Sequence, residues 1–253
     1  MTVLIISGLI VGLSLGLSGG GGSIFALPLL VYGAGVPVHQ AIVISLIVVG
    51  TTAFVGALQR IRSFEIDFKA ALVMILMSVI FAPCGAIISL KIPGSWLMIG
   101  FATLMFIVGT SLWIKTSRDK NQFPHHPHGK HLFSLILGAA LTSFLNGLFG
   151  VGGGFLIVPT LVFAASLNIK RAMATSLLVI GCVSFISTIT HLMEEQSLQV
   201  YTTEVFLAGG IVGVTFGINL AKNIKEDTLQ KGFSLMIICV GAFILLRELF
   251  GIS

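Results

Sequence analysis

Hydrophobic positions in this chain form long unbroken runs separated by short polar stretches. Six runs are about 20 residues long, the length of α-helix that crosses roughly 30 Å of hydrocarbon at 1.5 Å per residue. Two more, of about 35 residues, are too long for one crossing and too short for two ordinary ones. The runs cover 2–35, 38–59, 68–90, 96–114, 132–166, 172–193, 201–221 and 232–250. They predict an all-α integral membrane protein, and a β-barrel is excluded because the runs are continuous rather than alternating.

The chain contains an internal duplication. Residues 16–60 align without a gap with residues 147–191, so that GLSGGGGSIFALPLLV matches GLFGVGGGFLIVPTLV. A weaker match continues toward the end of each half. We therefore divide the chain into a first membrane repeat at 1–115, a His-rich linker at 116–130 and a second membrane repeat at 131–253.

A glycine cluster interrupts each of the two overlong runs at a corresponding place. Glycine breaks helices through its backbone freedom, and non-helical backbone at membrane depth persists only inside protein or beside water. Two models follow. Each overlong run is either one bent crossing or a helical hairpin that returns to the side from which it entered.

The Lys and Arg residues distinguish these models. With single crossings, the 14 basic residues divide 8 to 6 between the two sides, which is no bias. With returning hairpins, 12 of the 14 gather on one side and only Lys91 and Arg247 remain on the other. The positive-inside rule favours the second model. We therefore expect two inverted repeats, each a glycine-broken helical hairpin plus three transmembrane helices, with both termini outside and the linker in the cytoplasm.

Composition supports a membrane protein. Hydrophobic residues make up 56% of the chain and charged residues 9%, whereas soluble domains carry roughly 25% charged residues. The net charge of +5 comes from basic residues at the ends of apolar runs, so we expect the lipid bilayer and not nucleic acid as the partner. Glu204, early in its span, is the acidic residue best placed to lie within the membrane; it either couples transport to protons or lies at the interface.

The linker contains His125, His126, His128 and His131, which could bind a metal. No second ligand cluster completes such a site, and prolines in the linker indicate an extended, solvated segment. We expect no metal and no other cofactor. The single cysteines within apolar runs are better explained by packing than by disulfides.

Two helices should start just after the glycine clusters, near Ser23 and Phe155. A helix start presents unpaired backbone N–H groups and a positive dipole end, so two starts that face each other would form an anion site near the membrane midplane. Glycine lets backbone approach a ligand closely; the alternative is that the clusters serve only helix packing. The candidate residues in the two clusters are Gly20, Gly21, Gly22 and Ser23, and Gly152, Gly153 and Gly154.

Further candidates for anion binding are polar residues near the breaks or at helix ends. Ser45 and Ser176 occupy matching places in the two repeats, and a hydroxyl donates to an oxyanion without adding fixed charge. The alternative for Ser and Thr is hydrogen bonding to a neighbouring helix or to their own backbone. Arg60 either anchors its helix at the interface or contacts the permeating anion. The full set of candidates is Ser45, Gln59, Arg60, Asn146, Thr175 and Ser176.

These features resemble the TauE/SafE sulfite and organosulfonate exporter family, also called the 4-toluene sulfonate uptake permease family. The resemblance covers essentially the whole chain and rests on the duplicated glycine cluster followed by Pro28 and Pro159, the short loop, and the Ala172–Thr175–Ser176 pattern. The first copy departs from this pattern, since Ile44 stands where the second has Thr175. The resemblance implies transport of small sulfur-containing anions across the cytoplasmic membrane of a prokaryote.

We therefore expect a membrane transporter of sulfite, thiosulfate, a sulfonate or a related oxyanion, acting by ion-coupled alternating access. The substrate would bind between the two broken hairpins, a proton or sodium ion could be coupled, and the protein would be a monomer or homodimer. One alternative is an anion channel, although the polar lining is sparse. Another is a non-transporting scaffold or assembly protein. An enzyme is disfavoured because the sequence has no HExxH motif, no paired intramembrane acids and no Ser–His–Asp set at plausible depth.

Overall fold

The computed structural model describes residues 2–61, 66–118, 128–149, 154–192 and 200–250. Within these ranges the regular structure is entirely helical. The elements are α1 (Thr2–Ser18), α2 (Gly21–Pro28), the π-helix η1 (Leu29–Gly33), α3 (Val38–Ile61), α4 (Phe68–Ser89), α5 (Gly94–Arg118), α6 (His128–Phe149), α7 (Gly154–Phe163), α8 (Ile169–Leu192), α9 (Val200–Lys222) and α10 (Glu226–Phe250). The prediction of a metal-free linker falls on side chains outside the described part of the chain.

Six of the described helices are long and apolar enough to cross a membrane, namely α3, α4, α5, α8, α9 and α10. The two overlong apolar runs are each divided into shorter helices, α1 followed by α2 and η1, and α6 followed by α7. The predicted all-α membrane fold is confirmed. The helices after the breaks begin slightly earlier than expected, at Gly21 rather than Ser23 and at Gly154 rather than Phe155.

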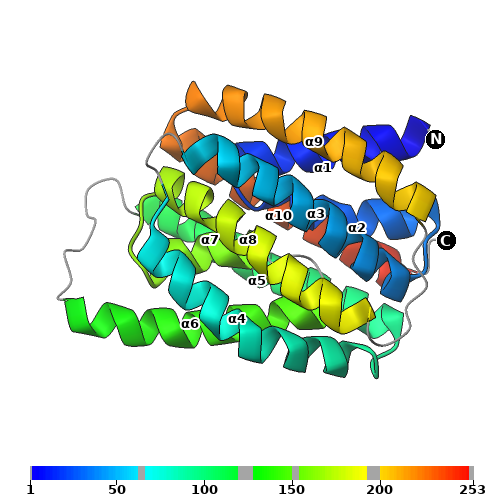
Figure 1. Ribbon diagram of the computed structural model, residues 1–253, viewed down its shortest axis with the longest axis horizontal. Coiled ribbons are helices and arrows are strands. Elements are labelled where there is room, and N and C mark those ends of the chain that lie inside the picture. Colours follow the sequence, from blue (N-terminus) through cyan, green and yellow to red (C-terminus); the bar gives the residue numbers. More distant parts are fainter. Residues whose placement is uncertain (1, 62–65, 119–127, 150–153, 193–199, 251–253) are drawn as a thin grey trace.

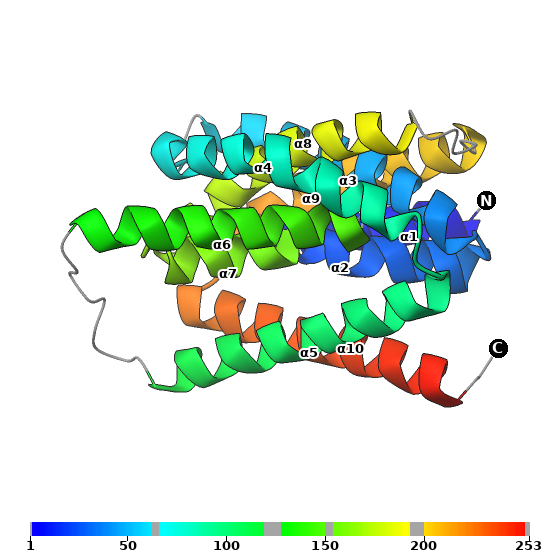
Figure 2. The same ribbon diagram turned by 90° about the horizontal axis from the view of Figure 1, so that it is seen from below.

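The two divided runs form hairpins. In Figures 1 and 2, α1 runs inward from the end of the molecule where the N-terminus lies, and α2 runs back toward that end. Helix α6 enters from the opposite end, and α7 returns toward it (Figure 2). We call the end that holds both termini the termini end, and the end where α5 finishes and α6 begins the linker end. How the repeats are oriented in a membrane stays a prediction.

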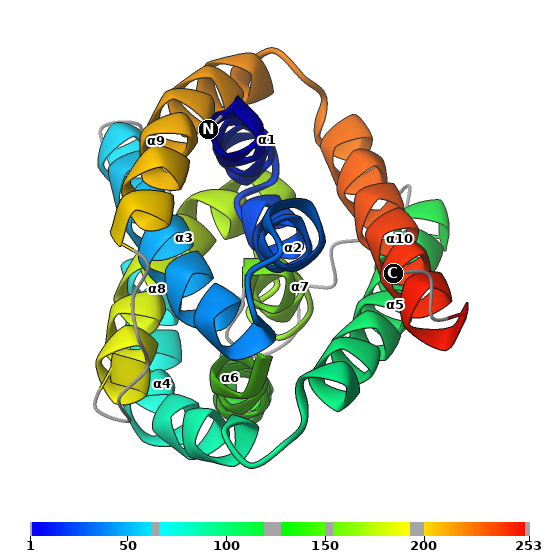
Figure 3. The ribbon, with the colours of Figure 1, turned by 90° about the vertical axis from the view of Figure 1, so that its right-hand side faces the viewer.

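Helix packing is symmetric under exchange of the two repeats. Helix α1 packs on α9 as α6 packs on α4, while α3 packs on α8, α5 on α10 and α2 on α7. Exchanging the repeats turns the first pair into the second and leaves each of the other pairs unchanged. In the view of Figure 3, α2 and α7 lie in the middle, between the α5–α10 pair on one flank and α3, α8 and α9 on the other.

Glycines allow the α1 and α9 backbones to touch. A Cβ on Gly16 would lie 2.5 Å from the Val214 carbonyl oxygen, and one on Gly213 would lie 2.7 Å from the Leu13 nitrogen. Small residues at such interfaces let membrane helices approach closely. The glycines that interlock in this way are Gly8, Gly12 and Gly16 on α1, and Gly209, Gly213 and Gly217 on α9. Gly209 and Gly213 therefore serve close helix packing.

Charged and aromatic residues mark the two ends of the helices. At the termini end, the described basic residues are Lys91, after α4, and Arg247, near the end of α10. Those at the linker end are Arg60, Lys69, Lys115, Arg118, Lys130, Lys170, Arg171, Lys222, Lys225 and Lys231. Trp96 and Tyr201, near the starts of α5 and α9, are exposed at the termini end, as expected for aromatic residues at a membrane interface.

Candidate functional site at the paired helix breaks

The two helix breaks meet in the interior of the molecule. Gly20 precedes α2, and Gly154 begins α7. A Cβ on Gly20 would overlap the carbonyl oxygen of Gly154, and a Cβ on Gly154 would lie 2.6 Å from Gly20 Cα. The starts of α2 and α7, one from each repeat, are therefore in backbone contact, with both positive dipole ends at the same place. Gly152 and Gly153 lie outside the described residues.

Gly19 gives the first break its shape. Its φ of +70° is in the left-handed region that favours glycine. A Cβ on Gly19 would also lie 2.5 Å from Met173 Cα on α8, so neither conformation nor space admits a side chain. The Ser176 hydroxyl donates to the Gly19 carbonyl at 2.6 Å and lies 2.9 Å from the Met173 carbonyl. Ser176 thus joins α8 to the first break by a hydrogen bond. Its role as a donor to an anion stays a prediction.

Gly22 and Ser23, in the first turn of α2, contact other residues of the same hairpin. The Ser23 hydroxyl donates to the Gly20 carbonyl at 2.7 Å and is fully buried. A Cβ on Gly22 would lie 2.5 Å from the Val11 carbonyl oxygen and 2.6 Å from Leu15 Cβ. Gly22 and Ser23 therefore make structural contacts that fold the hairpin, whatever they contribute to a ligand.

Gly21 faces side chains rather than backbone. A Cβ at this position would lie 2.7 Å from the Ser14 hydroxyl and would overlap the Ser18 hydroxyl and the end of Met236. The Gly21 N–H donates to Ser18 Oγ at 2.6 Å, Ser18 donates to the Ser14 carbonyl at 2.7 Å, and Ser14 Oγ donates to the Met236 sulfur at 3.2 Å. Neither serine was among the site residues predicted from the sequence. Their four-residue spacing, which places them on one face of the helix before the glycine cluster, was the available signal.

Asn146 places an amide inside the protein near the second break. The residue is 2% exposed, and neither side-chain amide atom has a hydrogen-bond partner. Leu15 occupies the matching position in the first repeat. A buried polar group without a partner costs about 1–3 kcal/mol, so its presence needs an explanation, and binding a ligand is one.

The remaining candidates lie at several places. Ser45 is fully buried on α3, and its hydroxyl donates to the Ile42 carbonyl at 3.0 Å. Gln59 lies at the linker end, where its amide donates to the Thr215 hydroxyl at 3.0 Å on an exposed surface. Arg60 is only 7% exposed, and its guanidinium donates to the Gly16 carbonyl at 3.2 Å, in the last turn of α1 before the break.

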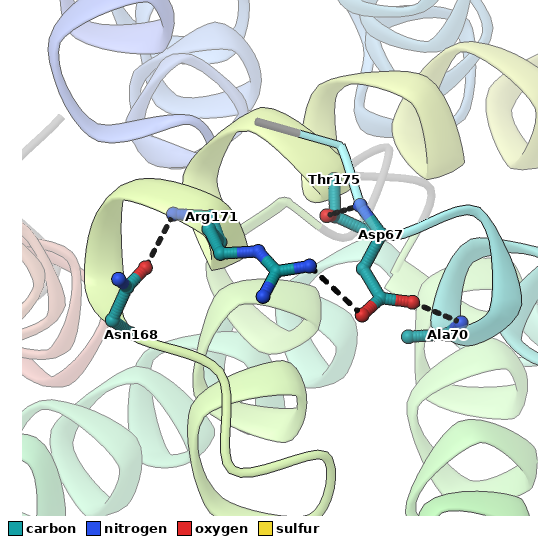
Figure 4. Close-up of polar contacts among 5 residues, drawn as sticks. All are labelled: Asp67, Ala70, Asn168, Arg171 and Thr175. Carbon is teal, nitrogen blue, oxygen red and sulfur yellow. Dashed lines mark hydrogen bonds and ion pairs between the residues drawn. The ribbon is translucent and has the colours of Figure 1, made fainter. Parts of the chain in front are cut away.

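Thr175 joins the two repeats at the start of α4, as Figure 4 shows. Its hydroxyl accepts a hydrogen bond from the Asp67 N–H at 2.9 Å. The Asp67 carboxylate accepts from the Ala70 N–H at 3.0 Å, which caps α4, and pairs with Arg171 at 3.4 Å. Asn168 accepts from the Arg171 N–H at 2.9 Å and so caps the start of α8. Within the described part of the chain, the Thr175 hydroxyl therefore contacts the start of α4.

A cavity of about 270 Å³ approaches the first break from the linker end. We call it the basic cavity, because its wall includes Arg60, Lys170 and Lys222. Met173 also lines it and packs against Gly19. Met173 therefore lies both at the wall of the basic cavity and beside the first break.

A second cavity of about 490 Å³ opens between α2–η1 and α10, toward the termini end. We call it the apolar cavity, because most of the side chains that line it are apolar or aromatic, Met236 among them. Arg247 lies 4.1 Å from the ring centre of Tyr32 at its outer part. Met236 lies against Gly21, so the first break is flanked by a cavity from each end of the molecule.

Comparison with known proteins gives a consistent result. A family model described as "Sulfite exporter TauE/SafE" matches residues 4–244. A "Probable membrane transporter protein" of Xylella fastidiosa is 33% identical, with 98% of this chain and 96% of the relative covered. The "Probable membrane transporter protein YunE" of Bacillus subtilis is 24% identical, with 98% of both covered. A relative from Methanocaldococcus jannaschii is 28% identical over 79% of this chain and 76% of its own length. No solved structure matches the chain at a significant level.

Proposed function

The chain belongs to the sulfite exporter TauE/SafE family, and we propose that it carries a small sulfur-containing anion, such as sulfite, thiosulfate or a sulfonate, across the membrane. The family resemblance found in the sequence is confirmed. The matching relatives come from bacteria and an archaeon and carry the description of membrane transporters. With six helices able to span a bilayer, the chain is a multi-pass protein of a prokaryotic cytoplasmic membrane.

The observation that carries the proposal is the contact between the starts of α2 and α7 at Gly20 and Gly154. Two helix N-termini supply partial positive charge without a fixed cation. Among the described residues, no Lys or Arg lies in the middle of a spanning helix. A fixed cation at the bilayer centre would cost at least about 2.5–3.5 kcal/mol on insertion scales. Helix ends supplemented by hydroxyl and amide groups bind a small oxyanion at lower cost.

We propose that the substrate binds at the paired breaks, with Gly21 and Ser18 contributing from the first repeat and Asn146 from the second. Gly21 faces the hydroxyls of Ser14 and Ser18, and the Asn146 amide can donate two hydrogen bonds that it does not make in this conformation. Ser176 can contribute its hydroxyl if it turns away from the carbonyl of Gly19. This set of neutral donors suits an oxyanion and offers nothing to recognise an amine.

The two cavities favour an alternating-access mechanism rather than a continuous channel. Met173 lines the basic cavity and lies against Gly19, while Met236 lines the apolar cavity and lies against Gly21. A carrier opens one such cavity at a time to its central site, whereas a channel needs a polar path through it. We propose coupling to a proton or sodium ion. Glu204, the acid considered from sequence, is exposed near the start of α9 and so does not face the breaks.

The test is uptake of labelled thiosulfate, sulfite, sulfate and a sulfonate into vesicles containing the purified protein. We expect saturable uptake, mutual competition among sulfur oxyanions, and accumulation driven by a pH or sodium gradient. Purely downhill flux that no gradient affects would favour a channel, and no flux would favour a scaffold. Transport of a cationic or neutral substrate, without competition from sulfur oxyanions, would refute the proposal.

A matched pair of variants locates the site. Gly21→Ala places a methyl group against the hydroxyls of Ser14 and Ser18, and we expect substrate affinity to fall by roughly 1–3 kcal/mol, the cost of imperfectly paired polar groups. Gly232→Ala makes the same chemical change where, apart from its own helix backbone and chain neighbours, no atom of the described residues lies within 4 Å, and should leave affinity unchanged. Binding is compared at equal folded fraction. Equal affinities in both variants would remove Gly21 from the site.

A further inference from the structure

The basic cavity gathers cations from three helices. Arg60 lies at the end of α3, Lys170 at the start of α8 and Lys222 at the end of α9. No acidic side chain is among the described residues that line this cavity. Like charges around one cavity produce a positive potential within it, and walls of low dielectric constant strengthen that potential. The cavity therefore attracts an anion.

Arg60 is the most buried of the three cations, at 7% exposed. Burial of a guanidinium costs free energy unless opposite charge and hydrogen bonds offset it. The Gly16 carbonyl, which accepts from Arg60 at 3.2 Å, belongs to the C-terminal turn of α1, where the helix dipole favours a cation. This contact holds the guanidinium at the cavity wall, so an arriving anion meets a cation that the protein has already positioned.

The lining selects a small oxyanion. An arginine fork can bind two oxygens of one ligand at once, and each lysine adds a compact charge with three donors. A volume of about 270 Å³ accommodates such an anion together with hydration water, each molecule of which takes about 30 Å³. The shared chemistry of sulfate, thiosulfate, sulfite and phosphate fits this lining, because each presents several oxygens around a central atom.

Met173 connects the basic cavity to the first break, since it lines the cavity and packs against Gly19. We propose that the basic cavity is a second oxyanion site, separate from the paired breaks, which holds the anion at the linker end before or after it passes Gly19. That its occupant is the transported anion rests on the function proposed above. The phosphate of an anionic lipid has the same chemistry, and basic pockets between membrane helices are known to take it; the experiment below distinguishes the two sources.

The test is calorimetric titration of the purified full-length protein in neutral detergent with sodium sulfate and sodium phosphate. The test variant is Lys170→Gln with Lys222→Gln; neither side chain is fully buried, so the fold should persist. The control is Lys69→Gln with Lys231→Gln, which removes the same charge from exposed positions at the same end of the molecule. We expect the test pair to weaken binding at least about tenfold and the control pair to change it less than about twofold.

Equal weakening in test and control pairs would show a diffuse charge effect and overturn the proposal, as would unchanged affinity in both. The titration is repeated in bilayer discs of phosphatidylcholine and of phosphatidylglycerol. Similar sulfate affinity in both lipids supports a free oxyanion in the cavity. Loss of sulfate binding only in phosphatidylglycerol, together with poorer retention of that lipid by the test pair, would assign the cavity to a lipid headgroup and overturn the proposal.

The readout is independent of transport. Because the titration uses equilibrium binding of sulfate and phosphate, a protein that carries no sulfur anion can still show the site, and an active transporter can lack it. In vesicles, the two lysine substitutions should raise KM about tenfold for substrate presented at the linker end and leave KM from the other end unchanged. An equal change in KM from both ends would contradict a site confined to the linker end.

Discussion

Gly20 and Gly154, one from each repeat, touch through their backbones at the point where α2 and α7 begin. Neither could carry a side chain without moving the other helix. The contact joins the two breaks into a single central feature and brings two positive helix ends together. Because the same glycines could serve helix packing and ligand binding, the two roles must be separated with variants at glycines that face backbone and at glycines that face side chains.

Gly154→Ala should destabilise the fold. Its Cβ would lie 2.6 Å from Gly20 Cα and 2.8 Å from the Gly20 carbonyl oxygen, and backbone cannot move aside as a flexible side chain can. We expect a loss of about 1–3 kcal/mol, the usual cost of overpacking, measured as a lower midpoint of thermal unfolding in detergent. Gly232→Ala, with open space around it, is the control and should be neutral or slightly stabilising. An unchanged midpoint for Gly154→Ala would contradict the close approach.

Ser176→Ala should loosen the first break, because it removes the 2.6 Å hydrogen bond to the Gly19 carbonyl. We expect about 1 kcal/mol of destabilisation and weaker substrate binding, and smaller effects for Ser176→Thr, which keeps the hydroxyl. Stability is read from thermal unfolding and affinity from titration at equal folded fraction. If the hydroxyl serves only the break, Ser176→Ala will lower stability and leave affinity as it was.

Asn146→Leu should weaken substrate binding without lowering stability. The amide is buried without a hydrogen-bond partner, and leucine occupies the matching position at Leu15. Replacing an unsatisfied polar group with an apolar one should leave the free energy of unfolding unchanged or higher, while substrate affinity falls. Unfolding and binding are measured on the same preparation. A large loss of stability would show that the amide has a structural partner, and full affinity would exclude it from the site.

Asp67 should act on stability mainly as the cap of α4. Asp67→Ala removes the acceptor of the Ala70 N–H and should cost about 1 kcal/mol. Asp67→Asn keeps an acceptor and loses only the 3.4 Å pair with Arg171, whose side chain is 48% exposed, so it should cost well under about 1 kcal/mol. Thermal unfolding of both variants tests this. An Asn variant as unstable as the Ala variant would show that charge, and not capping, stabilises this end of α4.

Both termini should lie outside and the linker end inside. Lys91 and Lys225 are exposed at opposite ends of the molecule, and each can be replaced by cysteine in a background without Cys84, Cys182 and Cys239. A membrane-impermeant thiol reagent applied to intact cells should label position 91 and spare position 225. The reverse pattern would place the basic residues outside and contradict the predicted orientation.

The sequence alone established the all-α membrane class, the six spanning helices and the position of both breaks. These features depend on hydropathy and glycine within one local stretch, so they can be read along the chain. The family was also recognisable, from the duplicated cluster followed by Pro28 and Pro159. The basic residues indicated which helix ends lie together, because their placement depends on the bilayer rather than on side-chain packing.

Only the tertiary structure decided what each residue near the breaks contacts. Ser176 and Thr175 are neighbours in sequence, yet one bonds to Gly19 and the other to the start of α4, because successive helical residues point in different directions. The burial of Arg60 and the exposure of Gln59 likewise depend on helices distant in the chain. Contacts between repeats arise from close packing of whole helices, and a local pattern of residue types does not specify which atoms meet.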